Sequence, residues 1–281
     1  MHELKKQLLN EFSDVFKKDL EKHDRIKMKP VKIETIPNAK AIRPHNAYTP
    51  IETPIHMQNA ANAELSRIMQ AGQLEECHHA TDWCARGFFV TKPSSTVDSI
   101  KVRLVSDFRG VNKILCRPGY PMDGSSLILK RLDPNETFFA TIDLSSGYHQ
   151  VALDPASRDM FSIILPQGKY RYTVLPQGAA SSCDIFNIIT DQGIRNKRGY
   201  FKNVYDIMTA ATNISQMRER LHALLLLCRD KNMKLNPDKF EVSHKVTFGG
   251  VELSGERKLG DKARKVYITP AIKRLEEFFA L

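Results

Sequence analysis

The stretch "TFFATIDLSSGYHQV" (residues 137–151) runs from apolar residues into a solitary carboxylate. Residues 137–143 are apolar and rich in β-forming side chains, which predicts a strand buried on both faces. Asp143 ends this strand, where a carboxylate is costly unless it is paired or bound to a metal ion. Asp143 could equally be the cap of a following helix. Tyr148 would lie near the same site if the chain turns back at Gly147, and the alternative is an ordinary core tyrosine.

A second acidic residue lies in "YFKNVYDIMTAAT" (200–212), which predicts two short strands joined by a tight turn. Asp206 is at the bend, and its neighbour is Tyr205. A carboxylate on a hairpin tip can hold a metal ion, but phosphoryl chemistry usually needs several carboxylates. From the hairpin alone, Asp206 is either a site residue or a turn residue.

The remaining elements are predicted from periodicity and turn residues. Asn213 and Gln216 form a capping-box pattern at the start of the most regular helix. Paired glycines break the last strand. Helices are expected over 4–16, 57–71, 181–195 and 214–232, and strands over 87–92, 101–106, either side of "PQG" (166–168), and 245–253. Helices and strands are mixed without a regular βαβ alternation, which predicts an α+β fold with a largely antiparallel sheet.

The composition favours a polyanionic partner. Lys and Arg exceed Asp and Glu by 42 to 32, a net charge of +10, which favours nucleic acid over a membrane surface. The longest apolar run, "ALLLLC" (223–228), is far too short to span a membrane. The five cysteines are scattered and odd in number, which argues against a framework of disulfide bonds and fits a reducing compartment. An intracellular protein is expected, in the cytoplasm, in particles or in the nucleus.

Three further clusters could carry chemistry. "CHHATDWC" (77–84) contains zinc-type ligands, but three of them are consecutive and no second cluster accompanies them, so an ordinary surface loop is the preferred interpretation. The loop "LPQGAASS" (175–182) allows close backbone approach to a flat ligand. Lys92 and Arg103, on the two arms of the first hairpin, could clamp a triphosphate, although two such cations are more often simply solvated.

The order of these motifs resembles that in the polymerase domain of reverse transcriptases, and most of all those of gypsy-type LTR retrotransposons. The motifs are "RLVSDFRGVN" (103–112), "YP" (120–121), "ATIDLSSGYHQV" (140–151), "LPQGAASS", the Asp206 hairpin and "LNPDKFEVSHKVTFGG" (235–250). The resemblance implies a right-hand fold of fingers and palm with only the start of a thumb. It divides the chain into an N-terminal arm (1–45), fingers (46–118 and 151–180), palm (119–150 and 181–256) and the start of a thumb or connection (257–281).

The resemblance also implies the residues of a templated DNA polymerase. Asp143 and Asp206 would hold two Mg²⁺ ions, with Mn²⁺ as an alternative metal. The expected partners are an RNA or DNA template–primer duplex and deoxynucleoside triphosphates. Among the other positions, Lys92 and Arg103 match residues that hold the triphosphate. Tyr148 matches the aromatic residue that packs under the incoming sugar, and Gln177 matches a residue that contacts the nucleotide. Phe248 and Gly249 match the loop that grips the primer end.

One position departs from the family pattern. The family hairpin carries two adjacent aspartates, and here Tyr205 occupies the first position while Asp206 occupies the second. Ala179 also replaces a larger apolar residue. A shift of one residue would make Asp206 the first aspartate, but the downstream match then worsens. We therefore expect a reverse transcriptase domain with impaired catalysis, and the alternative is an inactive module that binds nucleic acid or protein.

Overall fold

The structure, a computed structural model, describes residues 1–41, 46–96, 99–122, 130–195, 197–255 and 267–270. The chain forms two compact units, and each unit is assembled from segments that are distant in sequence. The first unit contains Met1–Asp19, Tyr120–Gly147 and Asn187–Leu281, and the second contains Leu20–Gly119 and Tyr148–Phe186. The expected N-terminal arm is therefore divided between the two units.

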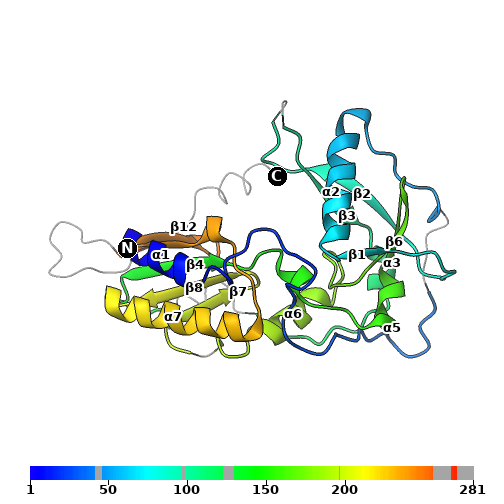
Figure 1. The fold of residues 1–281 in the computed structure, drawn as a ribbon. Coiled ribbons are helices and arrows are strands. Elements are labelled where there is room, and N and C mark those ends of the chain that lie inside the picture. The colour runs from blue at the N-terminus through cyan, green and yellow to red at the C-terminus, as the bar shows by residue number, and fades with distance from the viewer. Residues whose placement is uncertain (42–45, 97–98, 123–129, 196, 256–266, 271–281) are drawn as a thin grey trace. The chain divides into compact units, whose positions relative to one another are not determined.

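The first unit is built on a four-stranded antiparallel sheet (Figure 1). Its strand order is β7 (Tyr200–Asn203), β8 (Asp206–Ala211), β4 (Phe138–Asp143) and β9 (Glu241–Ser243). The strand predicted over 137–143 is confirmed as β4, which pairs with β8 on one side and β9 on the other. Its inner position explains why an apolar run was selected there, since both faces are covered.

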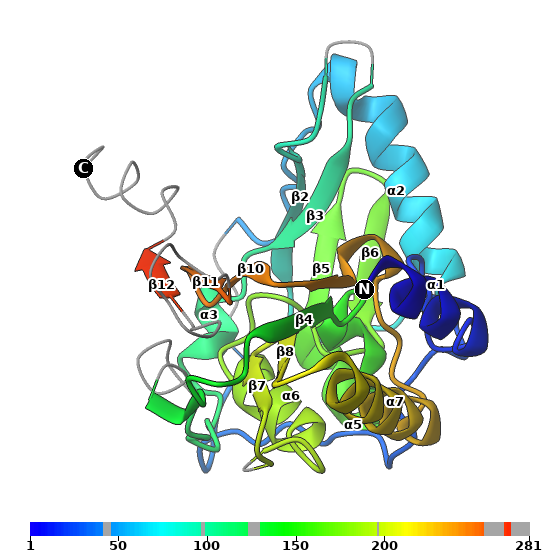
Figure 2. The same ribbon diagram turned by 90° about the vertical axis from the view of Figure 1, so that its left-hand side faces the viewer.

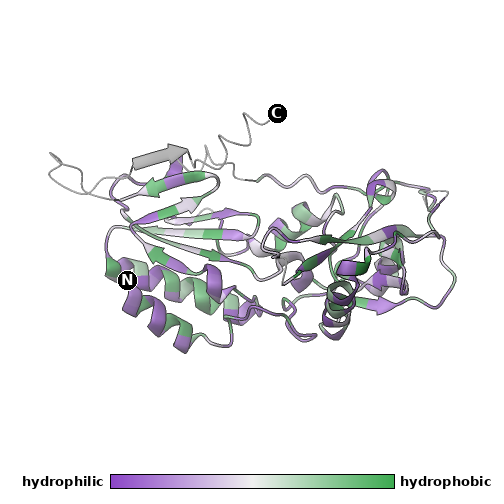
Figure 3. Cartoon of the chain, turned by 90° about the horizontal axis from the view of Figure 1, so that it is seen from above, coloured by the Kyte–Doolittle hydropathy of each residue, from purple (hydrophilic) through white to green (hydrophobic). Residues whose placement is uncertain are grey.

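Helix α7 (Ile214–Lys231) lies along one face of this sheet, as Figure 1 shows. Its buried stripe is the predicted one: Met217, Leu221, Leu224, Leu225 and Cys228. Asn213 caps the helix by accepting a bond of 2.9 Å from the amide of Gln216. The expected reciprocal bond is displaced by one residue, because the Gln216 side chain accepts from the amide of Thr212 instead. Figure 3 shows apolar and polar residues alternating along the helices that flank this sheet.

The opposite face of the sheet packs against β10 (Lys245–Phe248) and β11 (Val251–Ser254). The sequence predicted one broken strand here, and that prediction is wrong: the two strands are antiparallel and the chain reverses at Gly249 and Gly250. Both glycines have positive φ, 59° and 80°, which a two-residue turn of this kind requires. The shared core consists of Leu132, Phe139, Phe201, Met208, Ala210, Val246, Phe248 and Leu253.

The other elements of the first unit are short or terminal. Helix α1 (His2–Glu11) buries the predicted Leu4 and Leu8 but ends before Phe12 and Phe16, which the expected helix included, and η4 (Pro237–Lys239) precedes β9. A third strand, β12 (Tyr267–Pro270), pairs with β11. The rest of the expected thumb segment, 257–266 and 271–281, lies outside the described residues.

The second unit contains a five-stranded sheet of order β1-β6-β5-β2-β3, flanked by α2 (Figure 2). Its elements are α2 (Gln58–Gln70), β1 (Leu74–Glu76), β2 (Ala85–Thr91), β3 (Val102–Ser106), α3 (Arg109–Asn112), η2 (Gly147–Gln150), α5 (Pro155–Arg158), η3 (Asp159–Phe161), β5 (Ser162–Leu165) and β6 (Gly168–Tyr172). Both predicted hairpins, β2–β3 and β5–β6, are present, and only β2 and β5 pair in parallel among the named strands. Helix α6 (Ser182–Thr190) carries the chain back from this unit to the first.

Two further properties follow from the described residues. No disulfide joins any of the five cysteines, all of which lie in described segments. None of the described helices has the length and apolar character needed to cross a lipid bilayer.

Candidate active site

The two acidic residues singled out in the sequence lie opposite each other in the first unit. Asp143 is the last residue of β4 and Asp206 is the first of β8, and the register of the antiparallel pair aligns them directly. Directly opposed residues project from the same face of a sheet. Phe139 and Met208 project from that face too, because they are separated from the two acids by even numbers of residues. The acids therefore emerge on the β10–β11 face of the sheet, opposite to α7.

The hairpin that carries Asp206 has a strained two-residue turn. Asn203 pairs with Asp206, so Val204 and Tyr205 form the turn. Val204 has φ of 52°, a conformation that a β-branched residue rarely adopts and that costs about 1–2 kcal/mol. The backbone oxygen of Tyr205 accepts a bond of 3.1 Å from the amide of Leu144, the residue after Asp143. This bond places position 205 directly beside the end of β4.

The two acids at this edge of the sheet have different electrostatic surroundings. Asp143 is 9% exposed, and its Oδ2 lies 2.8 Å from the Nζ atom of Lys239. Partial burial of the Asp206 carboxyl, in a residue that stays exposed as a whole, is the largest cause that raises the pKa of Asp206 to about 6, and the adjacent Asp143 charge is the second. A hydrogen bond between the two carboxyl groups has the same effect, and Lys239 opposes it. The pair is therefore an anionic site that favours a proton or a cation.

Lys239 was not predicted as a site residue. It belongs to η4, which begins at Pro237 directly after Asn236, and the Asn236 side chain caps this turn by accepting from the amide of Asp238. The Asn236 amide in turn donates to the backbone oxygen of Asp143 at 2.8 Å. An Asn-Pro turn signal was visible in "LNPDKF", but only the tertiary pairing brings its lysine to Asp143.

In the second unit, the β2–β3 hairpin gathers cations on one face. Arg103 pairs with Val90, and Lys92 lies two residues beyond Val90, so both cations project from the same side. The Lys92 amide also bonds to the backbone oxygen of Lys101 at 2.7 Å, which adds a third cation to this face. Lys101 was not among the predicted residues, although its spacing of two from Arg103 was readable.

Tyr148 and Gln177 also lie in the second unit. The Tyr148 ring is buried against Phe186 in an edge-to-face contact, with centroids 5.2 Å apart. Gln177 is exposed, just before Gly178, whose φ is 91°. Asn112 fastens this loop, because its side chain donates to the Gly178 oxygen and accepts from the amide of residue 180, each at 2.9 Å.

The expected primer-grip residues are parts of the β10–β11 turn. Phe248 ends β10 and is 3% exposed, so its side chain belongs to the core of the first unit. Gly249 occupies the first position of the turn. A grip on a ligand would therefore come from the turn backbone rather than from the phenyl ring.

Comparison with known families assigns the chain. The family model described as reverse transcriptase (RNA-dependent DNA polymerase) matches residues 90–253. The chain belongs to the reverse transcriptase family. The Pol polyprotein of transposon 412 from Drosophila melanogaster is 35% identical over 163 residues, and that of transposon gypsy from the same organism is 34% identical over 139. The matched regions cover 57% and 49% of this chain and 13% of each polyprotein, so the chain corresponds to a small part of each relative.

Solved reverse transcriptases share the fold. The foamy viral protease-reverse transcriptase in complex with an RNA/DNA hybrid superposes with a TM-score of 0.77, at 21% identity, over 93% of this chain and 34% of the solved one. A form of that protein with double-stranded DNA gives 0.76 at 22% identity, over 90% and 43%. The expected right-hand α+β fold and the gypsy-type resemblance are confirmed.

The donor set of this reverse transcriptase domain fits a divalent cation only in part. Asp143 and Asp206 offer hard carboxylate oxygens, which suit Mg²⁺, and their mutual repulsion favours a cation between them. No third Asp, Glu, His or Cys of the described residues joins them in a ligand cluster. Position 205, the adjacent place on the turn, is a tyrosine and brings no carboxylate.

We predict that Asp206→Asn stabilises the metal-free reverse transcriptase domain at neutral pH. The pKa of Asp206 is raised to about 6 from 3.8, so the carboxylate costs stability increasingly as pH rises from about 4 to 6, and the cost is complete above 6. After allowance for solvent screening, the gain at pH 7 is on the order of 1 kcal/mol. Denaturant unfolding with a chelator present measures it, and the gain should vanish near pH 4. An equal gain at both pH values would contradict this account.

Proposed function

We propose that the chain is the polymerase domain of a gypsy-type retrotransposon, that it binds template–primer duplexes, and that its nucleotidyl transfer is weak. One observation carries the proposal: two opposed carboxylates, Asp143 and Asp206, stand at a strained turn whose remaining position is Tyr205. The arrangement has the frame of a metal site for phosphoryl transfer and lacks one of the expected acids. We accordingly assign the first unit to the palm and the second to the fingers.

The proposed cofactor is Mg²⁺, with Mn²⁺ as an alternative, held by Asp143 and Asp206. When bound, such ions activate the primer hydroxyl and neutralise the leaving pyrophosphate. The two acids alone supply less negative charge than two divalent ions require, so the affinity for a second ion should be low. Lys239 lies against Asp143 and lowers the site's negative charge further.

The proposed partners are an RNA or DNA template–primer duplex and deoxynucleoside triphosphates. The structures of the foamy viral relative contain double-stranded DNA and an RNA/DNA hybrid. On this chain, the cationic face of β2–β3, with Lys92 and Arg103, would hold the triphosphate. Tyr148 and Gln177 would contact the nucleotide. The turn at Phe248 and Gly249 would contact the primer end. The net charge of +10 would serve the sequence-independent contacts with duplex phosphates.

A second candidate function is duplex binding without catalysis. The 2.8 Å contact between Lys239 and Asp143 favours it, because the ammonium group already compensates the better-buried carboxylate without a metal ion. In that case the fold would persist as a nucleic-acid-binding module. Both candidate functions include binding of the duplex, and they differ only in whether the primer is extended.

Primer extension under single-turnover conditions separates the two candidates. We expect slow, Mg²⁺-dependent extension of a primed RNA template, and we expect Asp143→Asn to abolish it because the buried ligand is lost. Extension that survives Asp143→Asn would exclude the proposed site. No extension by either protein, with intact duplex binding, would support the binding module.

Duplex binding is tested separately by fluorescence anisotropy at several salt concentrations. If about four phosphates are neutralised, the affinity should fall about a hundredfold between roughly 50 and 200 mM salt. Asp143→Asn should bind at least as tightly as the unmodified protein, because the change removes a negative charge from the site. Binding that is insensitive to salt would contradict a nucleic-acid role of any kind.

A further inference from the structure

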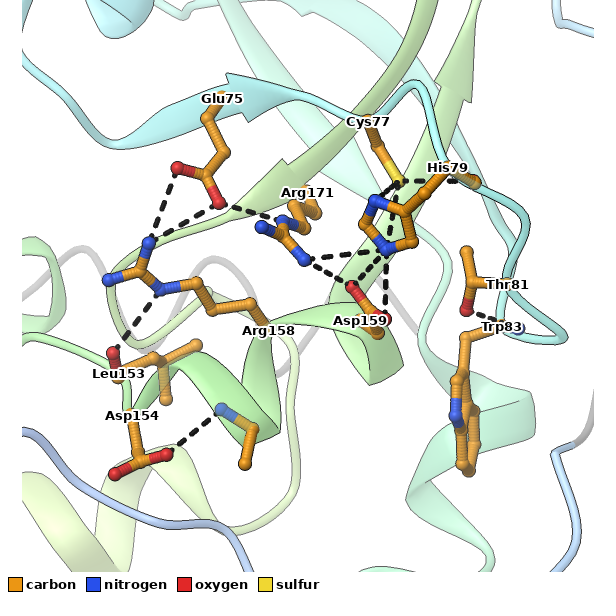
Figure 4. Close-up of polar contacts among 11 residues, drawn as sticks. Glu75, Cys77, His79, Thr81, Trp83, Leu153, Asp154, Arg158, Asp159 and Arg171 are labelled. Atoms are coloured by element: carbon orange, nitrogen blue, oxygen red, sulfur yellow. Dashed lines mark hydrogen bonds and ion pairs between the residues drawn. The ribbon is translucent and has the colours of Figure 1, made fainter.

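A second cluster of metal-ligating side chains lies in the second unit, whereas Asp143 and Asp206 belong to the first. Cys77 and His79 follow β1, and the amide of Cys77 continues the strand pairing by donating to the oxygen of Lys169 at 2.9 Å. In an extended chain, alternate residues project to the same side. Figure 4 shows Cys77 and His79 on the same side, and the intervening His78 bonds instead to Glu76 at 2.8 Å.

A third ligand reaches these two from a distant part of the chain. Asp159, the first residue of η3, places both carboxylate oxygens 3.0 Å from Nε2 of His79 (Figure 4). The thiol of Cys77 lies 3.9 Å from Nδ1 and 4.0 Å from Nε2 of the same ring. One ligand atom from each of the three residues falls within 4.8 Å of the others. The surface-loop interpretation of "CHHATDWC" counted three adjacent ligands and could not include Asp159.

Two of the three separations are close to those of a tetrahedral zinc site, and the third, between the Cys77 sulfur and an Asp159 oxygen, is within 4.8 Å. Atoms bound to one Zn²⁺ at about 2.0–2.3 Å lie roughly 3.3–3.7 Å apart at tetrahedral angles. The observed 3.0 Å and 4.0 Å differ from this range by only a few tenths of an ångström. The His79 ring must turn to aim one lone pair at a shared ion, and its 47% exposed side chain has room to do so.

Arg171 holds one carboxylate oxygen of Asp159, and both oxygens face the His79 ring. Arg171 bonds to Oδ1 of Asp159 at 2.5 Å and is itself held by Glu75 at 2.7 Å. Arg171 thus orients the carboxylate through Oδ1, whereas Oδ2 contacts the His79 ring at 3.0 Å, a contact that a bound ion would replace. Arg171, whose Nη1 lies 3.5 Å from the His79 ring, would retain Glu75 when an ion binds.

We propose that Cys77, His79 and Asp159 bind one Zn²⁺ ion, with water as the fourth ligand. A thiolate and a carboxylate supply two negative charges, and the neutral imidazole completes the set. The soft thiolate selects zinc over Mg²⁺, which prefers oxygen ligands. Arg171, held by Glu75, orients the carboxylate from outside the ligand set, as is usual around protein zinc sites. The ion would fasten the segment after β1 to η3, and this inference does not depend on polymerase activity.

Cobalt(II) titration of the full chain tests the site. After treatment with a chelator, and with excess Mg²⁺ to occupy oxygen-only sites, one equivalent of Co²⁺ should produce thiolate-to-cobalt charge-transfer absorption that Zn²⁺ abolishes. Cys77→Ser and His79→Ala should each weaken the affinity at least about a hundredfold, because loss of a ligand exceeds the 10–100-fold effect of an outer contact. His78→Ala is the matched control and should bind as the unmodified chain does.

Two further measurements keep the outcome independent of folding. Melting of each metal-free variant shows whether it is folded, and His79→Cys should restore cobalt binding with a stronger thiolate band. The proposal is overturned if the unmodified chain gives no such band, if Cys77→Ser keeps it through another thiol, or if His78→Ala is as defective as His79→Ala.

Discussion

Tyr205→Asp is expected to raise primer extension on a primed RNA template on the order of 10²–10⁴-fold over the unmodified protein. The Tyr205 backbone oxygen is bonded to Leu144, so a carboxylate at position 205 would project beside Asp143 and Asp206. Three acids can neutralise divalent ions that two cannot, and several kcal/mol of transition-state stabilisation correspond to this factor, since each 1.36 kcal/mol is tenfold. Single-turnover extension at saturating Mg²⁺ measures the effect.

Tyr205→Asn is the matched control for this experiment. Asparagine has the size of aspartate and removes the tyrosine ring equally, but it carries no charge. We expect Asn to recover little activity, and the Asp variant alone to show tighter apparent Mg²⁺ binding. Equal recovery by both variants would mean that the tyrosine ring obstructs the site and that charge is not the cause. If neither variant exceeds the unmodified protein, the impaired-site hypothesis is wrong.

Arg220→Met is expected to destabilise the chain by about 3–5 kcal/mol, a large part of the stability of an ordinary domain. Arg220 lies on α7, and its guanidinium contacts Glu136 at 2.6 Å and the backbone oxygen of Ala210 on β8. The two charged side chains are only 14% and 2% exposed. Without the arginine, the buried Glu136 side chain loses the cation that contacts it. Urea unfolding at neutral pH measures the loss.

An exposed ion pair and a double variant complete this test. Arg198 pairs with Asp133, but the Arg198 side chain is 77% exposed, so Arg198→Met should cost no more than about 1 kcal/mol. Combining Arg220→Met with Glu136→Leu should recover most of the loss, because the unpaired charge is then absent. A double variant as unstable as Arg220→Met alone would show that packing, rather than charge, dominates at this position.

The local patterns predicted elements more reliably than their partners. The α7 stripe and the β4 strand follow directly from apolar spacing, because burial repeats with the period of the element. The glycine pair at 249–250 was identified as a break but not as a reversal of the chain. A break and a two-residue turn have the same composition, and only the pairing of Phe248 with Val251 distinguishes them.

The amino-acid sequence by itself determined the family, the main strands and helices, and the two acids, because each of these depends on residues close together in the chain or on their order along it. The tertiary structure alone decided what lies beside those residues. The contacts of Lys239 with Asp143 and of Asp159 with His79 each join segments about 80 to 100 residues apart. No local pattern encodes such contacts, since they exist only after β4 pairs with β9 and β1 with β6.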